Sequence, residues 1–181
     1  MTDSDAKSLQ LMSPARIERT ITRIAFQIFE DNRGSDQLLI LGIHDRGYLL
    51  ADLLASKLSD ISGSAIKAHS VHIKNEQSTM PAAPDANLYG NVRGKKVIVV
   101  DDVLYSGRTM FEAIRLITSV ESPDEIRVAA LIDRGHRRYP VDIRYLGLYS
   151  PTKLKEHVAC RFTADGKPDG VWLVSSQPDS D

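Results

Sequence analysis

The sequence has almost no cysteine, almost no net charge and no long hydrophobic run. Its single cysteine, Cys160, excludes an internal disulfide and a cysteine-rich metal site, as expected in a reducing compartment. Lysine and arginine (23) nearly balance aspartate and glutamate (24), so the molecule as a whole does not attract nucleic acid or anionic membranes strongly. No run approaches the ~20 apolar residues of a membrane span. The polar, acidic N-terminus is not a secretory signal, and we expect a cytoplasmic protein.

Several motifs of common enzymes and metal sites are missing as well. The sequence contains no HExxH, CxxC, GxSxG or GxxxxGK[ST], and its five histidines have no metal-ligand spacing. These absences argue against a structural zinc site and a P-loop ATPase. A length of 181 residues allows one substantial domain. We expect a flexible leader at 1–13, a single α/β domain at 14–175 and a flexible tail at 176–181.

The stretch Lys96–Met110 combines a strand, a polar loop and a helix start. Val97–Val100 is apolar without alternation, which is typical of a strand buried on both faces of a parallel sheet. Asp101 and Asp102 follow, and then Ser106–Thr109 opens an amphipathic helix. The helix N-terminus suits a phosphate, whereas the carboxylates suit sugar hydroxyls or a bridging divalent cation. Alternatively, each part only ends a strand or caps a helix, but the whole arrangement favours a phosphorylated sugar.

Other segments repeat this organisation less distinctly. The apolar run Gln37–Ile43 breaks into the polar turn His44–Gly47, which is a second anion site or a structural turn. Glu125–Ile132 reads as a strand followed by a basic hexapeptide at 133–138. Residues 74–93 lack periodicity and contain two prolines, so we interpret them as a covering loop. Further elements are expected at 15–32 (helix) and at 64–73, 142–148 and 170–174 (strands), with 153–157 charged and exposed.

The first predicted helix has a basic stripe beside its apolar face. Arg16, Arg19 and Arg23 lie on one side of a helix with 3.6 residues per turn. Such a stripe is either a solvated surface or a phosphate-binding one, and solvated faces are more common. The stripe by itself does not indicate RNA binding.

The motif VIVVDDVLYSGRT at 97–109 resembles the signature of the type I phosphoribosyltransferases, which bind 5-phosphoribosyl 1-pyrophosphate (PRPP) with magnesium. Tyr105, the segment IDRGHRRYP at 132–140 and TRIA at 22–25 resemble more narrowly the bacterial pyrimidine attenuation regulators, which also act as uracil phosphoribosyltransferases. The similarity extends from about Arg16 to Val174. It implies the type I phosphoribosyltransferase fold, an α/β domain with a central, mostly parallel sheet flanked by helices and a small hood after Tyr145.

The resemblance also implies roles for individual residues. The resemblance assigns PRPP binding to Asp101, Asp102, Val103, Leu104, Tyr105, Ser106, Gly107, Arg108 and Thr109. In this assignment the two aspartates hold the ribose hydroxyls and, through PRPP, magnesium. Pyrophosphate binding falls to Ile43, His44, Asp45 and Arg46. The implied catalytic residues are Asp101, Asp102, Tyr105 and Arg46. Candidate RNA contacts are Arg19, Thr22, Arg23, Arg134, His136 and Arg137.

The implied reaction is uracil with PRPP to UMP and pyrophosphate, together with pyrimidine-responsive binding of an mRNA leader by a homodimer or larger oligomer. The sequence departs from the family pattern in three places. The segment HIKNEQSTMPAAPD at 72–85 has no arginine, whereas the covering loop of the family carries one in a tyrosine-arginine-aspartate cluster. Phe26 stands where the family has a histidine in its RNA-binding surface, and Leu148 stands where it has a lysine near the hood. Two alternatives therefore stay open: an RNA-binding, nucleotide-sensing regulator with little catalysis, and a phosphoribosyltransferase for a purine base.

Overall fold

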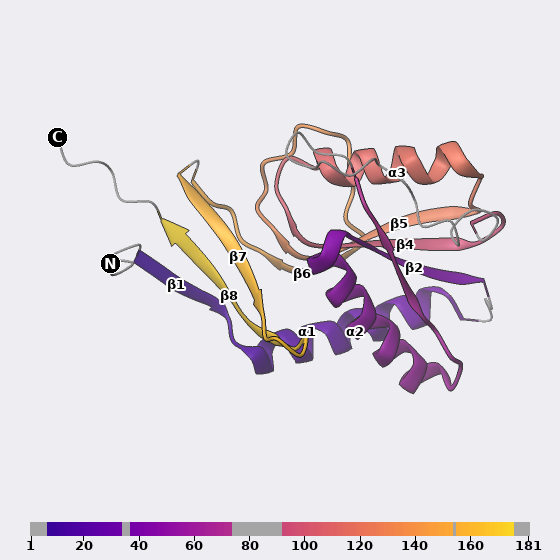
Figure 1. Ribbon diagram of the computed structural model, residues 1–181, viewed down its shortest axis with the longest axis horizontal. Helices are drawn as coiled ribbons and strands as arrows, with labels where there is room; N and C mark the ends of the chain where they lie inside the picture. Colours follow the sequence, from indigo (N-terminus) through magenta and orange to yellow (C-terminus); the bar gives the residue numbers. More distant parts are fainter. Residues whose placement is uncertain (1–6, 34–36, 74–91, 154, 176–181) are drawn as a thin grey trace.

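Five parallel strands form the centre of the molecule (Figure 1). The computed structural model describes residues 7–33, 37–73, 92–153 and 155–175. In spatial order the strands are β3 (Ala68–Val71), β2 (Leu38–Ile43), β4 (Lys96–Leu104), β5 (Glu125–Asp133) and β6 (Tyr145–Tyr149). The predicted parallel sheet is confirmed, with the aspartate-bearing strand β4 in the middle.

Helices cover both faces of this sheet, which explains the unalternated apolar runs. Val97 and Val99 of β4 pack in the core shared with helix α3 (Arg108–Val120). Ile98 and Val100 pack in a second core with α1 (Pro14–Asp31) and α2 (His44–Ser62). Figure 1 shows α3 on one side of the sheet and the other two helices opposite. The side chains on both faces of the strand are therefore buried, as in other parallel sheets.

A smaller antiparallel sheet forms the hood at one side of the molecule (Figure 1). Its strands, in the order β1-β8-β7, are β1 (Lys7–Met12), β8 (Pro168–Ser175) and β7 (Glu156–Phe162). The expected leader at 1–13 is wrong for residues 7–12, because they pair with β8. Residues 153, 155 and 157 are exposed as expected, and β7 begins within this segment at Glu156. Strand β1 depends on hydrogen bonds to β8, which is distant in sequence, so a local pattern does not reveal it.

Several element boundaries also differ from the sequence expectations. Strand β4 continues to Leu104, so the two aspartates lie within the strand, and α2 begins at His44 without an intervening turn. The strands expected at 64–73 and 142–148 are shorter or shifted, at Ala68–Val71 and Tyr145–Tyr149, because ladder pairing with β2 and β5 sets their limits. Ser13 is the N-cap of helix α1, where the Arg16 amide donates to Ser13 Oγ at 3.3 Å.

Most of the interpreted covering loop, residues 74–91, lies outside the described residues, as do 1–6 and 176–181. Within the described ranges, no helix has the length and apolar character needed to cross a bilayer.

Candidate active site

The carboxyl ends of β2 and β4 bring the two predicted anion-binding segments together. These strands pair in parallel with Gly42 opposite Val100, so Ile43 and Asp101 follow the last position at which β2 and β4 pair with each other and lie side by side. Two glycines permit this approach: a Cβ on Gly42 would lie 2.4 Å from the Gly47 carbonyl oxygen, and a Cβ on Gly47 would lie 2.8 Å from the Val100 carbonyl oxygen. The first turn of α2, with His44, Asp45 and Arg46, therefore lies against the aspartate-bearing end of β4.

The two adjacent carboxylates are anchored by the backbone of β4. The Asp102 amide donates to Asp101 Oδ1 at 3.0 Å, and the Val103 amide donates to Asp102 Oδ1 at 2.9 Å. The Asp102 residue is only 9% exposed. Burial and the neighbouring charge of Asp102 raise the pKa of Asp101 well above its ordinary value. Such a pair favours a ligand that brings hydrogen-bond donors or a cation.

The loop after β4 leads directly into the N-terminus of α3. Gly107, the N-cap of α3, has φ +81°, a left-handed conformation that suits glycine. The Arg108 amide donates to Ser106 Oγ at 3.3 Å, and Arg108 and Thr109 are exposed at the start of the helix. Helix N-termini present unpaired N–H groups and a positive dipole end, so this turn can bind a phosphate.

The residues of the basic hexapeptide make contacts inside the protein. Arg134 is 9% exposed, its guanidinium carbon lies 4.2 Å from the Tyr105 ring centroid, and its Nε donates to Thr152 Oγ1 at 2.8 Å. The His136 ring lies 5.2 Å from the Tyr105 ring, and its Nε2 hydrogen-bonds the Thr152 carbonyl oxygen. Arg137 forms an ion pair with Asp133 at 2.9 Å. The structure thus packs Arg134 and His136 around Tyr105, whereas the sequence suggested an RNA-facing patch.

The other candidate RNA contacts lie on α1. Arg23 donates from its guanidinium to the carbonyl oxygens of Leu146 at 2.8 Å and Gly147 at 3.2 Å, so it covers the edge of β6. Thr22 Oγ1 donates to the Glu18 carbonyl oxygen at 2.9 Å, and Arg19 is exposed. These contacts leave RNA binding by α1 as a prediction.

Two residues that sequence reasoning did not select also reach the site. Cys160 of β7 is buried, and its burial together with the nearby Asp102 carboxylate raises the pKa of its thiol. The His72 ring lies 5.9 Å from the His44 ring at the ends of β3 and β2. Burial, and then the charge of His72, lower the pKa of His44. No local motif marks either residue, because hood packing and strand order bring them here.

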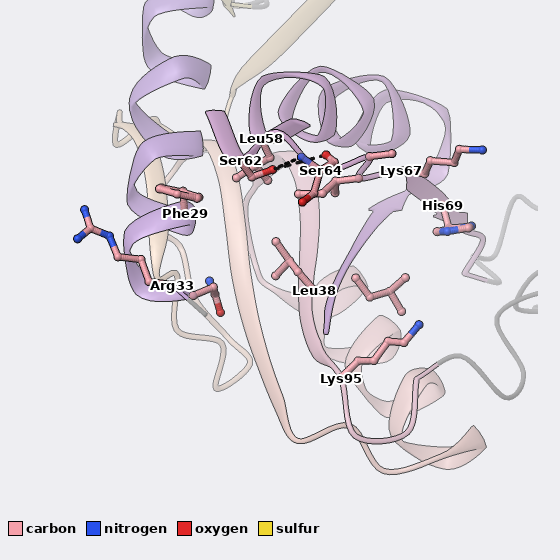
Figure 2. A pocket seen from close by; sticks show the side chains of 13 residues that line it. Phe29, Arg33, Leu38, Leu58, Ser62, Ser64, Lys67, His69 and Lys95 are labelled. Atoms are coloured by element: carbon pink, nitrogen blue, oxygen red, sulfur yellow. Dashed lines mark hydrogen bonds between the residues drawn. The ribbon is translucent and has the colours of Figure 1, made fainter. Parts of the chain in front are cut away.

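A cavity of about 620 Å³ lies at the opposite edge of the sheet (Figure 2). Phe29 and Arg33 at the end of α1 form one side, and Lys67 and His69 form the other. Leu38 and Lys95 place it at the amino ends of β2 and β4, away from the aspartates. Open α/β sheets bind ligands at the carboxyl ends of their strands. The candidate active site is therefore the Asp101 edge.

Comparisons with known proteins identify relatives over nearly the whole chain. The family model described as phosphoribosyl transferase domain matches residues 9–160. A protein named Bifunctional protein PyrR from Listeria welshimeri is 36% identical over 181 residues, covering 94% of this chain and 99% of the relative. One of the same name from Clostridium acetobutylicum is 38% identical over 168 residues, covering 90% and 94%.

Solved structures share the fold at lower sequence identity. A hypoxanthine-guanine phosphoribosyltransferase from Bacillus anthracis has a TM-score of 0.67 and 19% identity, covering 85% of this chain and 86% of that one. The hypoxanthine phosphoribosyltransferase from Trypanosoma cruzi in complex with the product IMP has a TM-score of 0.68 and 17% identity, covering 84% and 80%. These structures support the shared architecture of sheet, helices and hood.

Proposed function

Because the chain belongs to the phosphoribosyltransferase family, we propose that it transfers the 5-phosphoribosyl group of PRPP to uracil, giving UMP and pyrophosphate. The observation that carries this proposal is the meeting of three features at one sheet edge. The paired carboxylates of Asp101 and Asp102 lie between the N-terminus of α3 and the first turn of α2. PRPP carries ribose hydroxyls and anionic groups at two ends, which calls for such an arrangement.

Each segment has a chemical role in the proposed reaction. Asp101 and Asp102 accept hydrogen bonds from the ribose hydroxyls, and the amides and hydroxyls of 106–109 hold the 5-phosphate. Ile43 and the first turn of α2 hold pyrophosphate, with Arg46 adding charge-assisted hydrogen bonds to the departing group. Tyr105, which precedes the phosphate-binding turn, is assigned to the same site. The chain's contribution is mainly to position the partners and stabilise the charge that leaves the anomeric carbon.

The residues at this edge fit magnesium that is shared with the substrate. Among the described residues, no cluster of three histidine, cysteine or acidic side chains could hold a metal by itself. Mg²⁺ commonly takes one or two carboxylates together with substrate phosphates, and Asp101 and Asp102 are hard oxygen donors of this kind. Bound between these carboxylates and PRPP, the ion would neutralise charge on the leaving pyrophosphate.

The decisive experiment incubates the protein with PRPP, Mg²⁺ and one base at a time: uracil, cytosine, hypoxanthine or guanine. We expect UMP and pyrophosphate from uracil only. Product from hypoxanthine or guanine alone would contradict the base assignment and favour the purine alternative. No product with any base, with PRPP binding retained, would favour a nucleotide-sensing regulator.

PRPP binding itself is tested by thermal unfolding. At a PRPP concentration about 100 times Kd, binding stabilises the fold by ~2.7 kcal/mol, which raises Tm by roughly 5–10 °C for a domain of this size. Asp102→Asn should abolish this rise because it removes a hydrogen-bond acceptor for the ribose and a negative charge. An equal rise in wild type and variant would contradict the assigned role of Asp102.

We propose RNA binding as a second function, on narrower grounds. Close relatives share a name that states two functions, and Arg19 presents an exposed guanidinium on α1. The test is a gel shift with the leader RNA of a pyrimidine operon at several salt concentrations. Binding should weaken steeply with salt and weaken further in Arg19→Ala, whereas the charge-matched control Arg115→Ala on α3 should bind normally. Absence of binding at low salt would remove this function.

A further inference from the structure

Three consecutive carbonyl oxygens, at the end of β4 and in the loop after it, all accept hydrogen bonds from the segment 133–139. The Arg134 amide donates to the Leu104 carbonyl oxygen at 2.9 Å. Arg137 Nη1 donates to the Tyr105 carbonyl oxygen at 3.2 Å. The amides of Arg138 and Tyr139 donate to the Ser106 carbonyl oxygen at 2.9 and 3.1 Å. The loop's carbonyl groups are therefore fixed by one neighbouring segment of chain.

Arg137 is the only member of this set that acts through its side chain, and all three nitrogens of its guanidinium are engaged. Besides the bond to Tyr105, its Nε donates to the Val141 carbonyl oxygen at 3.3 Å, and its Nη2 pairs with Asp133 Oδ2 at 2.9 Å. The side chain of Arg137 is 24% exposed and that of Asp133 14%. The fork geometry of arginine suits this simultaneous bridging, which a lysine cannot reproduce in full.

The stem of Arg137 also packs against the glycine that starts α3. A Cβ built on Gly107 would lie 3.5 Å from Arg137 Cδ and 3.4 Å from a methyl group of Val141. One side chain therefore fixes the carbonyl of Tyr105 and supports the left-handed turn at Gly107. Arg137 therefore contacts the residues on both sides of Ser106, at the start of the phosphate-binding turn.

We propose that Arg137 is a positioning residue for PRPP, which holds the 105–107 backbone so that its amides face the 5-phosphate. The inference rests on the proposed function, because it assigns the 5-phosphate to this turn. Backbone donors help a bound anion most when their direction is fixed before binding. The guanidinium itself is turned toward carbonyl oxygens and Asp133 and does not serve as a ligand contact.

The test compares Arg137→Ala and Arg137→Lys with wild type and with Arg115→Ala, which removes an exposed arginine from α3. Calorimetry gives Kd for PRPP with Mg²⁺, and steady-state assays give KM for PRPP and for the base separately. We expect Arg137→Ala to raise Kd and KM for PRPP about tenfold, equivalent to ~1.4 kcal/mol. KM for the base should stay unchanged, Arg137→Lys should recover part of the loss, and Arg115→Ala should match wild type.

The possible outcomes distinguish failure of the positioning role of Arg137 from failure of the proposed transferase function. Wild-type PRPP affinity in Arg137→Ala, or an equal rise in KM for both substrates, would overturn it while the transferase function stands. Failure of the wild-type protein to bind PRPP would overturn the proposed function and the inference with it. If Arg137→Ala does not fold, Arg137→Lys decides: a PRPP-specific loss supports positioning, and wild-type affinity overturns it.

Discussion

Replacing Gly47 with alanine should destabilise the protein and weaken PRPP binding, although it places a better helix former inside α2. In an open helix the change would stabilise by about 1 kcal/mol. Here the new Cβ would lie 2.8 Å from the Val100 carbonyl oxygen and 3.5 Å from Asp101 Oδ1. The first neighbour is backbone in the central strand, so α2 must move away from β4. Overpacking of this kind costs about 1–3 kcal/mol.

The two effects oppose each other, and we expect a net loss of up to about 2 kcal/mol. For a domain of this size a loss of about 2 kcal/mol lowers Tm by roughly 4–8 °C. The shift also separates the first turn of α2 from Asp101, so Kd for PRPP should rise. The control Ser56→Ala, at an exposed site on the same helix, should change neither Tm nor Kd. Thermal unfolding and calorimetry measure the two effects. A Tm at or above wild type would refute the argument that this approach requires glycine.

Two further predictions concern titratable groups. Partial burial alone would raise the pKa of Asp31, but hydrogen bonds from Arg144 and Tyr145 hold it below its ordinary value of 3.8. The ionised Asp31 therefore stabilises the fold above pH 3.8, and this stabilisation is lost as the pH falls through the lowered pKa. Asp31→Asn should therefore cost about 2 kcal/mol at pH 7 in urea unfolding, and the difference from wild type should disappear in acid; a pH-independent difference would contradict this. Burial and the neighbouring Asp102 raise the thiol pKa of Cys160, so at pH 8 Ellman's reagent should label native protein far more slowly than urea-unfolded protein, and equal rates would contradict its placement.

The central sheet and the PRPP loop follow closely from local sequence. The run before Asp101 is apolar at every position because β4 is covered on both faces, and that pattern is readable without coordinates. The turn at 106–109 carries its own conformational signal, since glycine at Gly107 adopts the positive φ that ends the loop. Motif order along the chain then indicates a phosphosugar site.

The hood and the basic hexapeptide could not be predicted in the same way. Strand β1 pairs with β8, which is distant in sequence, and β7 joins the same sheet through its own pairing with β8. The charges of Arg134 and Arg137 are visible in the sequence, but the acceptors that engage them are not. From sequence alone, a cluster of arginines indicates an exposed anion-binding patch. The structure shows that Thr152 accepts a hydrogen bond from Arg134 and that the Tyr105 carbonyl oxygen accepts one from Arg137.

The sequence by itself determined the parallel sheet, the strand that carries Asp101 and Asp102 and the glycine turn that starts α3, because periodicity and turn chemistry act between near neighbours. Only the tertiary structure decided that Cys160 lies beside Asp102, that α2 begins without an intervening turn and that Arg137 donates to the carbonyl oxygen of Tyr105. Those contacts join segments from separate strands and loops, and their partners are selected by packing.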